Sequence, residues 1–223
     1  MTSTPLAAAV LWDLDGTLVD SEHYWAIGEQ TLASRYPGEW SHEDGLALTG
    51  LSLPVSCAII KEKLQIHDLT VEEIIHELTD IVMDKLREEI PWRPGALELV
   101  AQLHKAGVRQ AMVTMSIRRM ALAVVAGMNE SLGFEAFELV VAGDDVSNGK
   151  PHPEAYLTAA RQLGLEPSQC VAIEDSINGL HAAEAAGTRA LGVPNVVHLP
   201  AKEGRNIWPT LVGVTPHQLN ELF

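Results

Sequence analysis

Short apolar runs that recur along the chain, each separated from the next by helix-like sequence, constrain the fold more than any other feature. The first run, residues 7–12, is apolar at every position. Strands that are buried on both faces have this pattern, because helices cover both sides of a parallel sheet. Similar short runs follow at residues 109–114, 138–142, 170–173 and 189–193. Each is long enough for one strand.

Helix-like segments stand between these runs and end at glycines. Residues 96–106, 153–163 and 178–186 are each followed directly by a glycine. A glycine just past the last helical residue is typical of a helix end, because it adopts the left-handed conformation that closes the helix. Strands that alternate with helices at this spacing predict an α/β fold. We expect a Rossmann-like, doubly wound parallel sheet with helices on both faces.

One long segment interrupts this alternation. Residues 24–34, 53–64 and 71–87 are helix-like, and no strand-like run lies among them. Thr70 and Glu73 form the pattern of a capping box at the start of the third of these helices. The segment therefore predicts a helical unit inserted after the first strand.

The length of the chain agrees with such an insertion. At 223 residues the chain is too long for one average domain and too short for two. We expect an α/β core formed by residues 1–18 and 91–223, and a helical domain formed by residues 19–90. Linkers near residues 17–20 and 89–94 would then act as a hinge.

Charge and cysteine content exclude several classes of protein. With 15 Lys and Arg against 30 Asp and Glu, the formal net charge is −15. Such a charge argues against partners that are nucleic acids or anionic membrane surfaces. A small anionic substrate remains compatible with it where a metal or a local cation reverses the field. The two cysteines are far apart in sequence, and no apolar run is long enough to span a membrane. We expect a cytoplasmic protein that is a monomer or a weak dimer.

Polar side chains follow four of the predicted strands at the point where each strand ends. Ligands of open parallel sheets bind at the carboxyl ends of the strands. Any one such residue is commonly a helix cap or a turn residue, but the set as a whole predicts a functional site. Its members are Asp13, Asp15, Thr114, Ser116, Asp144, Asp145, Lys150, Glu174 and Asp175.

The acids of this set indicate a divalent cation. Asp13 and Asp15 are two residues apart, so in an extended segment their side chains point to the same side. Two carboxylates on one side repel each other unless a cation lies between them or one is protonated. Glu174 and Asp175 would complete an oxygen-rich site, which suits Mg²⁺ better than zinc.

The same residues carry a resemblance to a known family. The segment from Asp13 to Glu22, DLDGTLVDSE, resembles the first signature of the haloacid dehalogenase superfamily in its phosphatase form. Thr114, Lys150 and the pair Glu174–Asp175 resemble the remaining signatures, in the same order along the chain. The helical insertion resembles the C1-type cap of the branch that contains β-phosphoglucomutase and phosphoglycolate phosphatase.

This resemblance implies a mechanism. Asp13 would be the nucleophile that attacks phosphorus and forms an aspartyl-phosphate, and Asp15 would be the general acid and then the general base. Mg²⁺ would be held by Asp13, the backbone carbonyl of Asp15 and Asp175, with Glu174 bound directly or through water. Lys150 would pair with the nucleophile and the phosphate. The phosphate would be bound by Lys150 together with Gly16, Thr17, Thr114, Met115 and Ser116.

The insertion would determine specificity by closing over the substrate. The residues expected to face the site are Glu22, Trp25, Glu29, Thr49, Gly50 and Ser52. In mutases of this branch, a basic residue of the cap loop binds a second phosphate, and valine usually stands at the position of Thr17. Leu53 stands near the position of that basic residue here.

These two differences favour a phosphatase for a small sugar, polyol or hydroxy-acid phosphate. The alternative is a β-phosphoglucomutase-like mutase that acts on a sugar phosphate. Dehalogenation by the same aspartate and a non-catalytic binding role are further alternatives. Asp15 argues against the dehalogenase, and the intact set of site residues argues against the binding protein.

Overall fold

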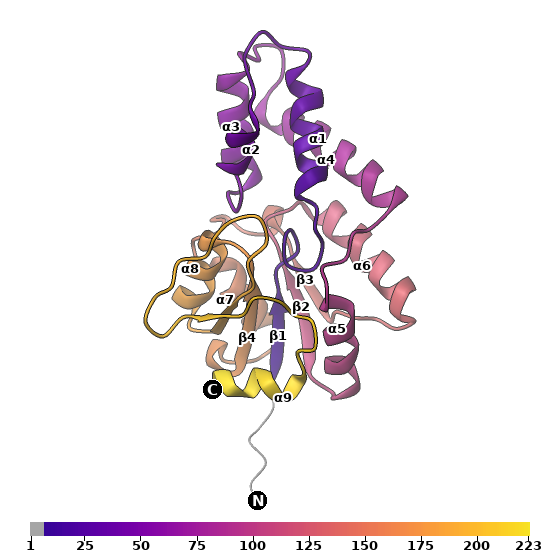
Figure 1. The fold of residues 1–223 in the computed structure, drawn as a ribbon, viewed down its shortest axis with the longest axis vertical. Helices are drawn as coiled ribbons and strands as arrows, with labels where there is room; N and C mark the ends of the chain where they lie inside the picture. Colours follow the sequence, from indigo (N-terminus) through magenta and orange to yellow (C-terminus); the bar gives the residue numbers. More distant parts are fainter. Residues whose placement is uncertain (1–6) are drawn as a thin grey trace, which may run out of the picture.

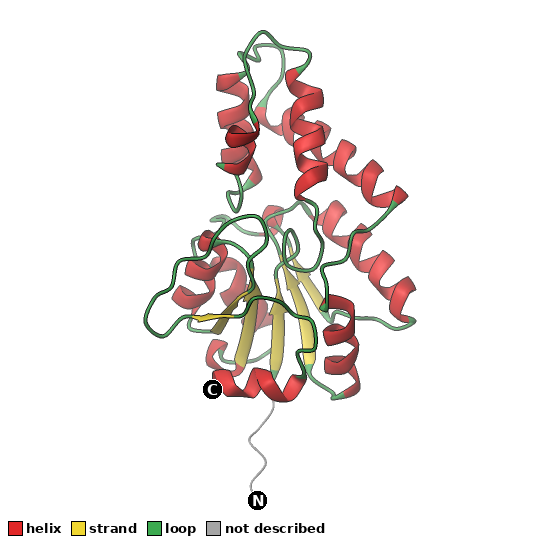
Figure 2. Ribbon diagram, in the orientation of Figure 1, coloured by secondary structure: helices red, strands yellow, loops and turns green. Residues whose placement is uncertain are grey.

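A parallel β-sheet forms the centre of the computed structural model, which describes residues 7–223 (Figures 1 and 2). Within this range the sheet has six strands in the order β3-β2-β1-β4-β5-β6, and every neighbouring pair is parallel. The strands are β1 (Ala9–Trp12), β2 (Arg109–Val113), β3 (Leu139–Val141), β4 (Cys170–Glu174), β5 (Arg189–Gly192) and β6 (Asn206–Ile207). The parallel sheet predicted from the sequence is confirmed.

Both faces of this sheet are covered by helices, as the apolar runs predict. Along β1, Val10 and Trp12 pack into one apolar cluster, whereas Ala9 and Leu11 pack into another on the opposite face. The first cluster includes side chains of α5 (Ala96–Lys105), α6 (Arg118–Leu132) and α9 (Pro216–Leu219). The second includes side chains of α7 (Glu154–Gln162) and α8 (Ile177–Ala186).

Between β1 and α5 the chain forms only helices. They are α1 (Glu22–Ala33), α2 (His42–Leu46), α3 (Leu53–Lys63) and α4 (Val71–Glu88). We call residues 22–88 the helical insertion. It has an apolar cluster of its own, which includes Leu32, Ile60, Ile74 and Leu78. Figure 1 shows the insertion beyond one end of the sheet, with the C-terminus at the other end.

The two connections to the insertion run side by side. The backbone N–H of Asp20 donates to the carbonyl of Pro91 at 2.8 Å, and that of Arg93 donates to the carbonyl of Leu18 at 2.8 Å. The side chain of Asp20 accepts a hydrogen bond from Asn195 at 3.0 Å. The segments expected to form a hinge are thus linked to each other.

Short elements were not predicted from the sequence. Helix α2 has no buried residue, so it lacks the apolar periodicity that indicates a helix. Strand β6 is only two residues long. Three short 3₁₀ turns, Gly143–Asp145, Pro167–Gln169 and Asn220–Leu222, complete the described elements. The predicted capping box at Thr70 and Glu73 is present. No helix within residues 7–223 is long and apolar enough to cross a membrane.

Two adjacent isoleucines of α3 test the packing of the insertion. Ile60 is 1% exposed within its apolar cluster, whereas Ile59 is 40% exposed. Truncation of the buried side chain leaves a cavity, so Ile60→Ala is expected to lower the free energy of unfolding by about 2–5 kcal/mol. Ile59→Ala is the matched control and is expected to change it by less than about 1 kcal/mol. Urea denaturation of both variants measures the difference, and equal losses would contradict this packing.

Candidate active site

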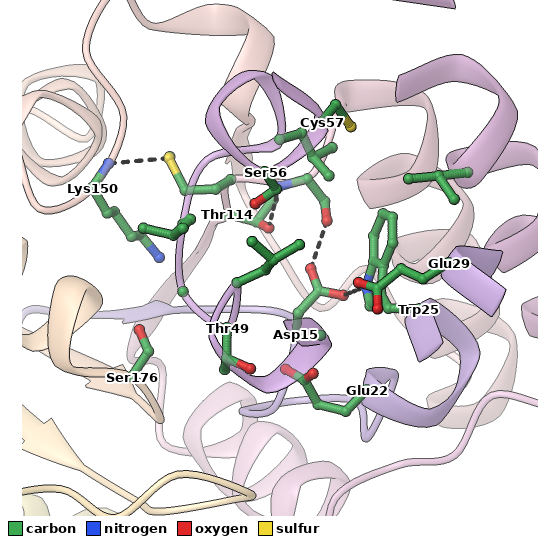
Figure 3. A pocket seen from close by; sticks show the side chains of 18 of the residues that line it. Asp15, Glu22, Trp25, Glu29, Thr49, Ser56, Cys57, Thr114, Lys150 and Ser176 are labelled. Atoms are coloured by element: carbon green, nitrogen blue, oxygen red, sulfur yellow. Dashed lines mark hydrogen bonds between the residues drawn. The ribbon is translucent and has the colours of Figure 1, made fainter. Parts of the chain in front are cut away.

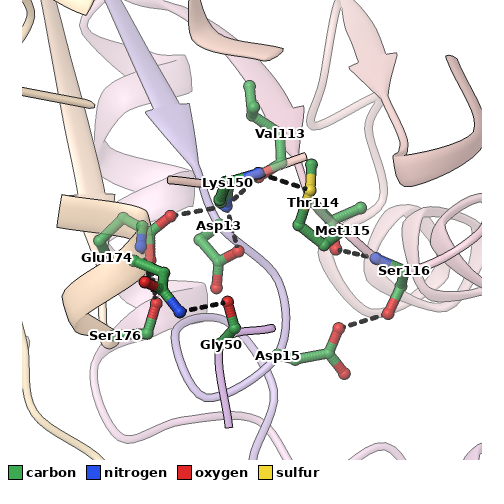
Figure 4. Close-up of polar contacts among 12 residues, drawn as sticks. Asp13, Asp15, Gly50, Val113, Thr114, Met115, Ser116, Lys150, Glu174 and Ser176 are labelled. Atoms are coloured by element: carbon green, nitrogen blue, oxygen red, sulfur yellow. Dashed lines mark hydrogen bonds and ion pairs between the residues drawn. The ribbon is translucent and has the colours of Figure 1, made fainter. Parts of the chain in front are cut away.

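The carboxyl ends of β1, β2 and β4 meet at the edge of the sheet that faces the insertion. Because β1 lies between β2 and β4, the residues that follow these strands are neighbours. Asp13 follows β1, Thr114 follows β2, and Glu174 ends β4. Figure 4 shows these side chains converging from the three strands. The sheet thus brings together the residues that the sequence analysis selected.

Lys150 occupies the centre of this group. Its Nζ donates to Asp13 Oδ1 at 2.7 Å, to Glu174 Oε1 at 2.6 Å and to the Val113 carbonyl at 2.9 Å. The Lys150 side chain is only 3% exposed. Burial alone would lower the pKa of Lys150, but the charges of Asp13 and Glu174 outweigh it and raise that pKa above its usual range. Lys150 is therefore a permanent cation at the base of the site.

One cation does not balance the acids around it. Asp13, Glu174 and Asp175 each offer an oxygen within 4.8 Å of the others. Burial, together with repulsion from Glu174, raises the pKa of Asp13 to about 7, although Lys150 counteracts this. Burial and the charges of Asp13 and Glu174 raise the pKa of Asp175 well above its usual range. The three carboxylates therefore carry more negative charge than Lys150 alone can balance.

A divalent cation fits this cluster. Asp175 Oδ2 is buried, and no hydrogen-bond donor contacts it within the described part of the chain. A buried carboxylate oxygen without a partner is costly, and a metal ion would satisfy it. The donors are carboxylate oxygens, which suit Mg²⁺ rather than a soft metal. Asp13 and Asp175 are the residues best able to hold it.

Glu174 is already bound by three donors. Besides Lys150, the Tyr156 hydroxyl donates to Oε1 at 2.6 Å and the Ser176 hydroxyl to Oε2 at 3.3 Å. Glu174 is fully buried. These bonds favour a role in which Glu174 holds Lys150, with any metal contact secondary. Sequence analysis did not select Tyr156, because a single tyrosine in a helix pattern resembles a core residue.

Gly16 makes room for Asp175. Its φ is +82°, and a Cβ at this position would lie 2.0 Å from Asp175 Oδ2. A side chain at position 16 would therefore displace the Asp175 carboxylate. Gly16 was expected to bind phosphate, and this close approach is a separate reason for glycine there.

The Asp15 carboxylate points away from the other acids. The Ser21 hydroxyl and the Trp25 indole donate to its Oδ1 at 2.6 and 3.0 Å, and the Ser116 hydroxyl donates to its Oδ2 at 2.5 Å. Ser116 belongs to the core (Figure 4), whereas Trp25 lies on α1 of the insertion (Figure 3). Asp15, the general acid expected from the sequence, is thus hydrogen-bonded by residues of both the core and the insertion. Sequence analysis missed Ser21, because serine before a helix indicates only a cap.

A cavity opens above these residues, between the core and the insertion. Its empty volume is about 780 Å³, part of it open to solvent. Thr114, Met115, Ser116 and Lys150 line it from the core. From the insertion it is lined by Glu22, Trp25, Glu29, Gly45, Leu48, Thr49, Gly50, Leu51, Leu53, Ser56, Cys57, Ile60 and Leu78.

Some selected residues lie elsewhere. Ser52 does not line the cavity; it precedes α3 and lies close to Gly149. Thr17 is buried outside the lining, and no partner is found for its hydroxyl in residues 7–223. Asp144 accepts the backbone N–H of Arg118 at 2.8 Å, and Asp145 forms an ion pair with that arginine. Asp144 and Asp145 therefore stabilise the start of α6 and do not join the site.

The acid cluster predicts an unusual dependence of stability on pH and metal. The pKa of Asp13 in the folded protein, about 7, lies above its ordinary value of 3.8. Between these values the folded state binds more protons than the unfolded state, so stability falls as pH rises. We expect the Tm in EDTA to decrease from about pH 5 to about pH 8 by a few degrees, as about 1–2 kcal/mol would produce.

Calorimetry with EDTA or Mg²⁺ measures this effect. Mg²⁺ binds the ionised carboxylates, so it is expected to raise the Tm more at high pH than at low pH. Asp175→Asn removes one of the acids and is expected to weaken both effects. A Tm that rises with pH in EDTA, or that does not change when Mg²⁺ is added, would contradict the metal site.

The Trp25 indole provides a test of how Asp15 is positioned. An indole N–H only donates, so Trp25→Phe keeps the ring and removes one hydrogen bond to a carboxylate. A bond of this kind contributes about 1.5–3 kcal/mol, so turnover of an aryl phosphate is expected to fall about tenfold or more. KM is expected to change little while kcat falls, a difference that a purely structural role would not cause. Trp208→Phe, which removes an indole N–H away from Asp15, is the control.

Comparisons with known proteins agree with this geometry. A family model described as haloacid dehalogenase-like hydrolase matches residues 10–193. Protein CbbY of Cereibacter sphaeroides is 33% identical over 192 residues, which is 83% of this chain and 84% of that protein. Hexitol phosphatase A of Escherichia coli is 33% identical over 196 residues, 82% of this chain and 81% of that protein. Both relatives match over most of their length.

A solved structure is similar to the whole fold. A CbbY variant from Rhodobacter sphaeroides, in complex with xylulose 1,5-bisphosphate, superposes with a TM-score of 0.81 at 28% sequence identity. The match covers 94% of this chain and 96% of that one. The similarity therefore includes the helical insertion as well as the sheet.

Proposed function

Because the chain belongs to the haloacid dehalogenase-like hydrolases, in their phosphatase branch, we propose that it hydrolyses a small phosphate monoester. The reaction would pass through an aspartyl-phosphate intermediate and would use Mg²⁺ as cofactor. The substrate class is a sugar, polyol or hydroxy-acid phosphate. The observation that carries this proposal is the buried Asp13 carboxylate, which is bound to Lys150 and lies next to Asp175. Oδ2 of Asp175 has no hydrogen-bond partner among residues 7–223. Mg²⁺ supplies positive charge that offsets the charge of the phosphate.

The proposed reaction has two steps, transfer of the phosphoryl group to Asp13 and hydrolysis of the aspartyl-phosphate. Asp13 attacks phosphorus, and the bond from phosphorus to the ester oxygen breaks as Asp15 gives that oxygen a proton. Asp15 then takes a proton from water, the water oxygen attacks phosphorus, and inorganic phosphate leaves while Asp13 is restored. Lys150 neutralises charge on the phosphate oxygens, and Thr114 and the backbone N–H groups beside it orient them.

The helical insertion acts in this proposal as the cap domain expected over residues 19–90, and it excludes water from the site. Its position across the cavity from the core supports this role. The loop at Gly50 contacts the core, since the Asn178 side chain donates to the Gly50 carbonyl at 3.2 Å. The two adjacent linkers would let the cap move as one unit.

Substitution of the nucleophile tests this proposal. Asp13→Asn keeps the shape of the side chain and removes the attacking oxygen, so Mg²⁺-dependent phosphate release is expected to fall at least about a thousandfold. Asp144→Asn is the matched control, because Asp144 lies outside the cavity and an amide oxygen can still accept from Arg118. Substantial phosphate release by Asp13→Asn would exclude the aspartyl-phosphate.

The substrate itself is found by screening metabolite monophosphates for phosphate release with and without Mg²⁺. The mutase remains the alternative. A panel that contains β-glucose 1-phosphate with glucose 1,6-bisphosphate separates the two reactions. Isomerisation that is faster than phosphate release would favour the mutase.

A further inference from the structure

The part of the cavity formed by the insertion lacks positive charge. No arginine or histidine, and no lysine other than Lys150, lines the cavity anywhere in residues 7–223. Lys150 is already bound to Asp13, Glu174 and a carbonyl at the base of the site. An anionic group on the leaving alcohol would therefore meet no free cation of the protein in this space.

The charged residues that line the cavity from the insertion, Glu22 and Glu29, are both acidic. Glu22 and Glu29 are seven residues apart on α1, which is about two helical turns, so they lie on the same face with Trp25 between them. All three line the cavity (Figure 3). We call these three residues the acidic face of α1. It lies beside Asp15, the expected proton donor to the leaving alcohol.

Both acids are largely buried, and only Glu22 has other acids as its charged neighbours. Burial and the charges of Asp15, Glu29 and Asp20 raise the pKa of Glu22 to about 7. Burial also raises the pKa of Glu29, whose Oε2 accepts a hydrogen bond from the Trp40 indole at 3.1 Å. These carboxyl oxygens need hydrogen-bond donors rather than further anions.

The acidic face also borders other free space. A second cavity, about 850 Å³ and partly open, is also lined by Glu22, Trp25 and Glu29. His23 and His42 line this second cavity, together with Asp20. His23 and His42 therefore belong to this second cavity and not to the lining of the cavity that contains Asp13 and Lys150.

We propose that the acidic face of α1 selects against anionic leaving groups, so that the substrate is the monophosphate of an uncharged, hydroxyl-rich alcohol. This inference rests on the proposed phosphatase function and narrows it, since it removes hydroxy-acid phosphates and bisphosphates from the substrate class. Hydroxyl groups can hydrogen-bond to both glutamates. Above pH 7, where Glu22 is ionised, a carboxylate or a second phosphate is repelled, and apart from Lys150 no cationic side chain of residues 7–223 lines the cavity to bind it. The similar protein CbbY, by contrast, was crystallised with a bisphosphate.

Pairs of substrates that differ only in the charge of the leaving group test this selection. Glycerol 3-phosphate and 3-phosphoglycerate differ by a hydroxymethyl against a carboxylate, and xylulose 5-phosphate and xylulose 1,5-bisphosphate differ by one phosphate. At pH 8, where Glu22 is ionised, we expect kcat/KM to be at least about tenfold higher for the uncharged member of each pair. 4-Nitrophenyl phosphate reports the chemistry of the core independently. Equal or reversed preference would overturn the proposal.

Conservative variants assign the selection to α1. Glu22→Gln and Glu29→Gln are each expected to reduce the ratio of kcat/KM for the uncharged substrate to kcat/KM for the charged one several-fold. Glu72→Gln is the matched control: Glu72 lies on α4 of the same insertion, its side chain is 86% exposed, and the ratio is expected to stay unchanged. An unchanged ratio in the Glu22 and Glu29 variants would overturn the role of the acidic face.

Two further measurements separate this inference from its premise. Calorimetric binding of the same pairs to Asp13→Asn with Mg²⁺ ranks them without turnover, so the selection is tested even if the protein hydrolyses nothing. Failure to hydrolyse 4-nitrophenyl phosphate would count against the phosphatase alone. A preference for ethanolamine phosphate over glycerol 3-phosphate would overturn the assignment to an uncharged leaving group.

Discussion

The rest of the site depends on one buried ammonium among three buried carboxylates. Lys150 lies 2.6–2.7 Å from oxygens of Asp13 and Glu174, with Asp175 next to them. Charges this deep are tolerated only when they are paired and hydrogen-bonded. Lys150 fixes Asp13 and Glu174, whereas Asp175 Oδ2 has no partner in the described part of the chain. The fold thereby creates a place for a divalent cation.

Asp15 connects this buried charge to the helical insertion. Its carboxylate is bound by Ser116 after β2 and by Trp25 on α1. The insertion leaves the core only a few residues after Asp15, and its two linkers are hydrogen-bonded to each other. Any movement of the insertion would therefore change the surroundings of Asp15 directly. Proton transfer and cap closure would be coupled by this contact.

The strong negative charge of the chain is compatible with a phosphate ester as substrate. Within the site, Lys150 and the proposed cation would supply positive charge only where the phosphate would bind. Away from that point the charged side chains that line the cavity from the insertion are the acids Glu22 and Glu29, and Glu22 is ionised above about pH 7. The global charge therefore does not exclude an anionic substrate, but it restricts where on the substrate the negative charge can lie.

The sequence by itself determined the parallel sheet, the helical insertion and most of the site. Short apolar runs that alternate with helix-like segments are typical of buried parallel strands, and residues such as Asp13, Thr114 and Glu174 stand where these runs end. Only the tertiary structure decided how these side chains pair. The bonds from Tyr156 to Glu174 and from Trp25 to Asp15 join residues on different elements, and no local pattern encodes such contacts. Packing of the insertion against the core also decided which acids face the cavity.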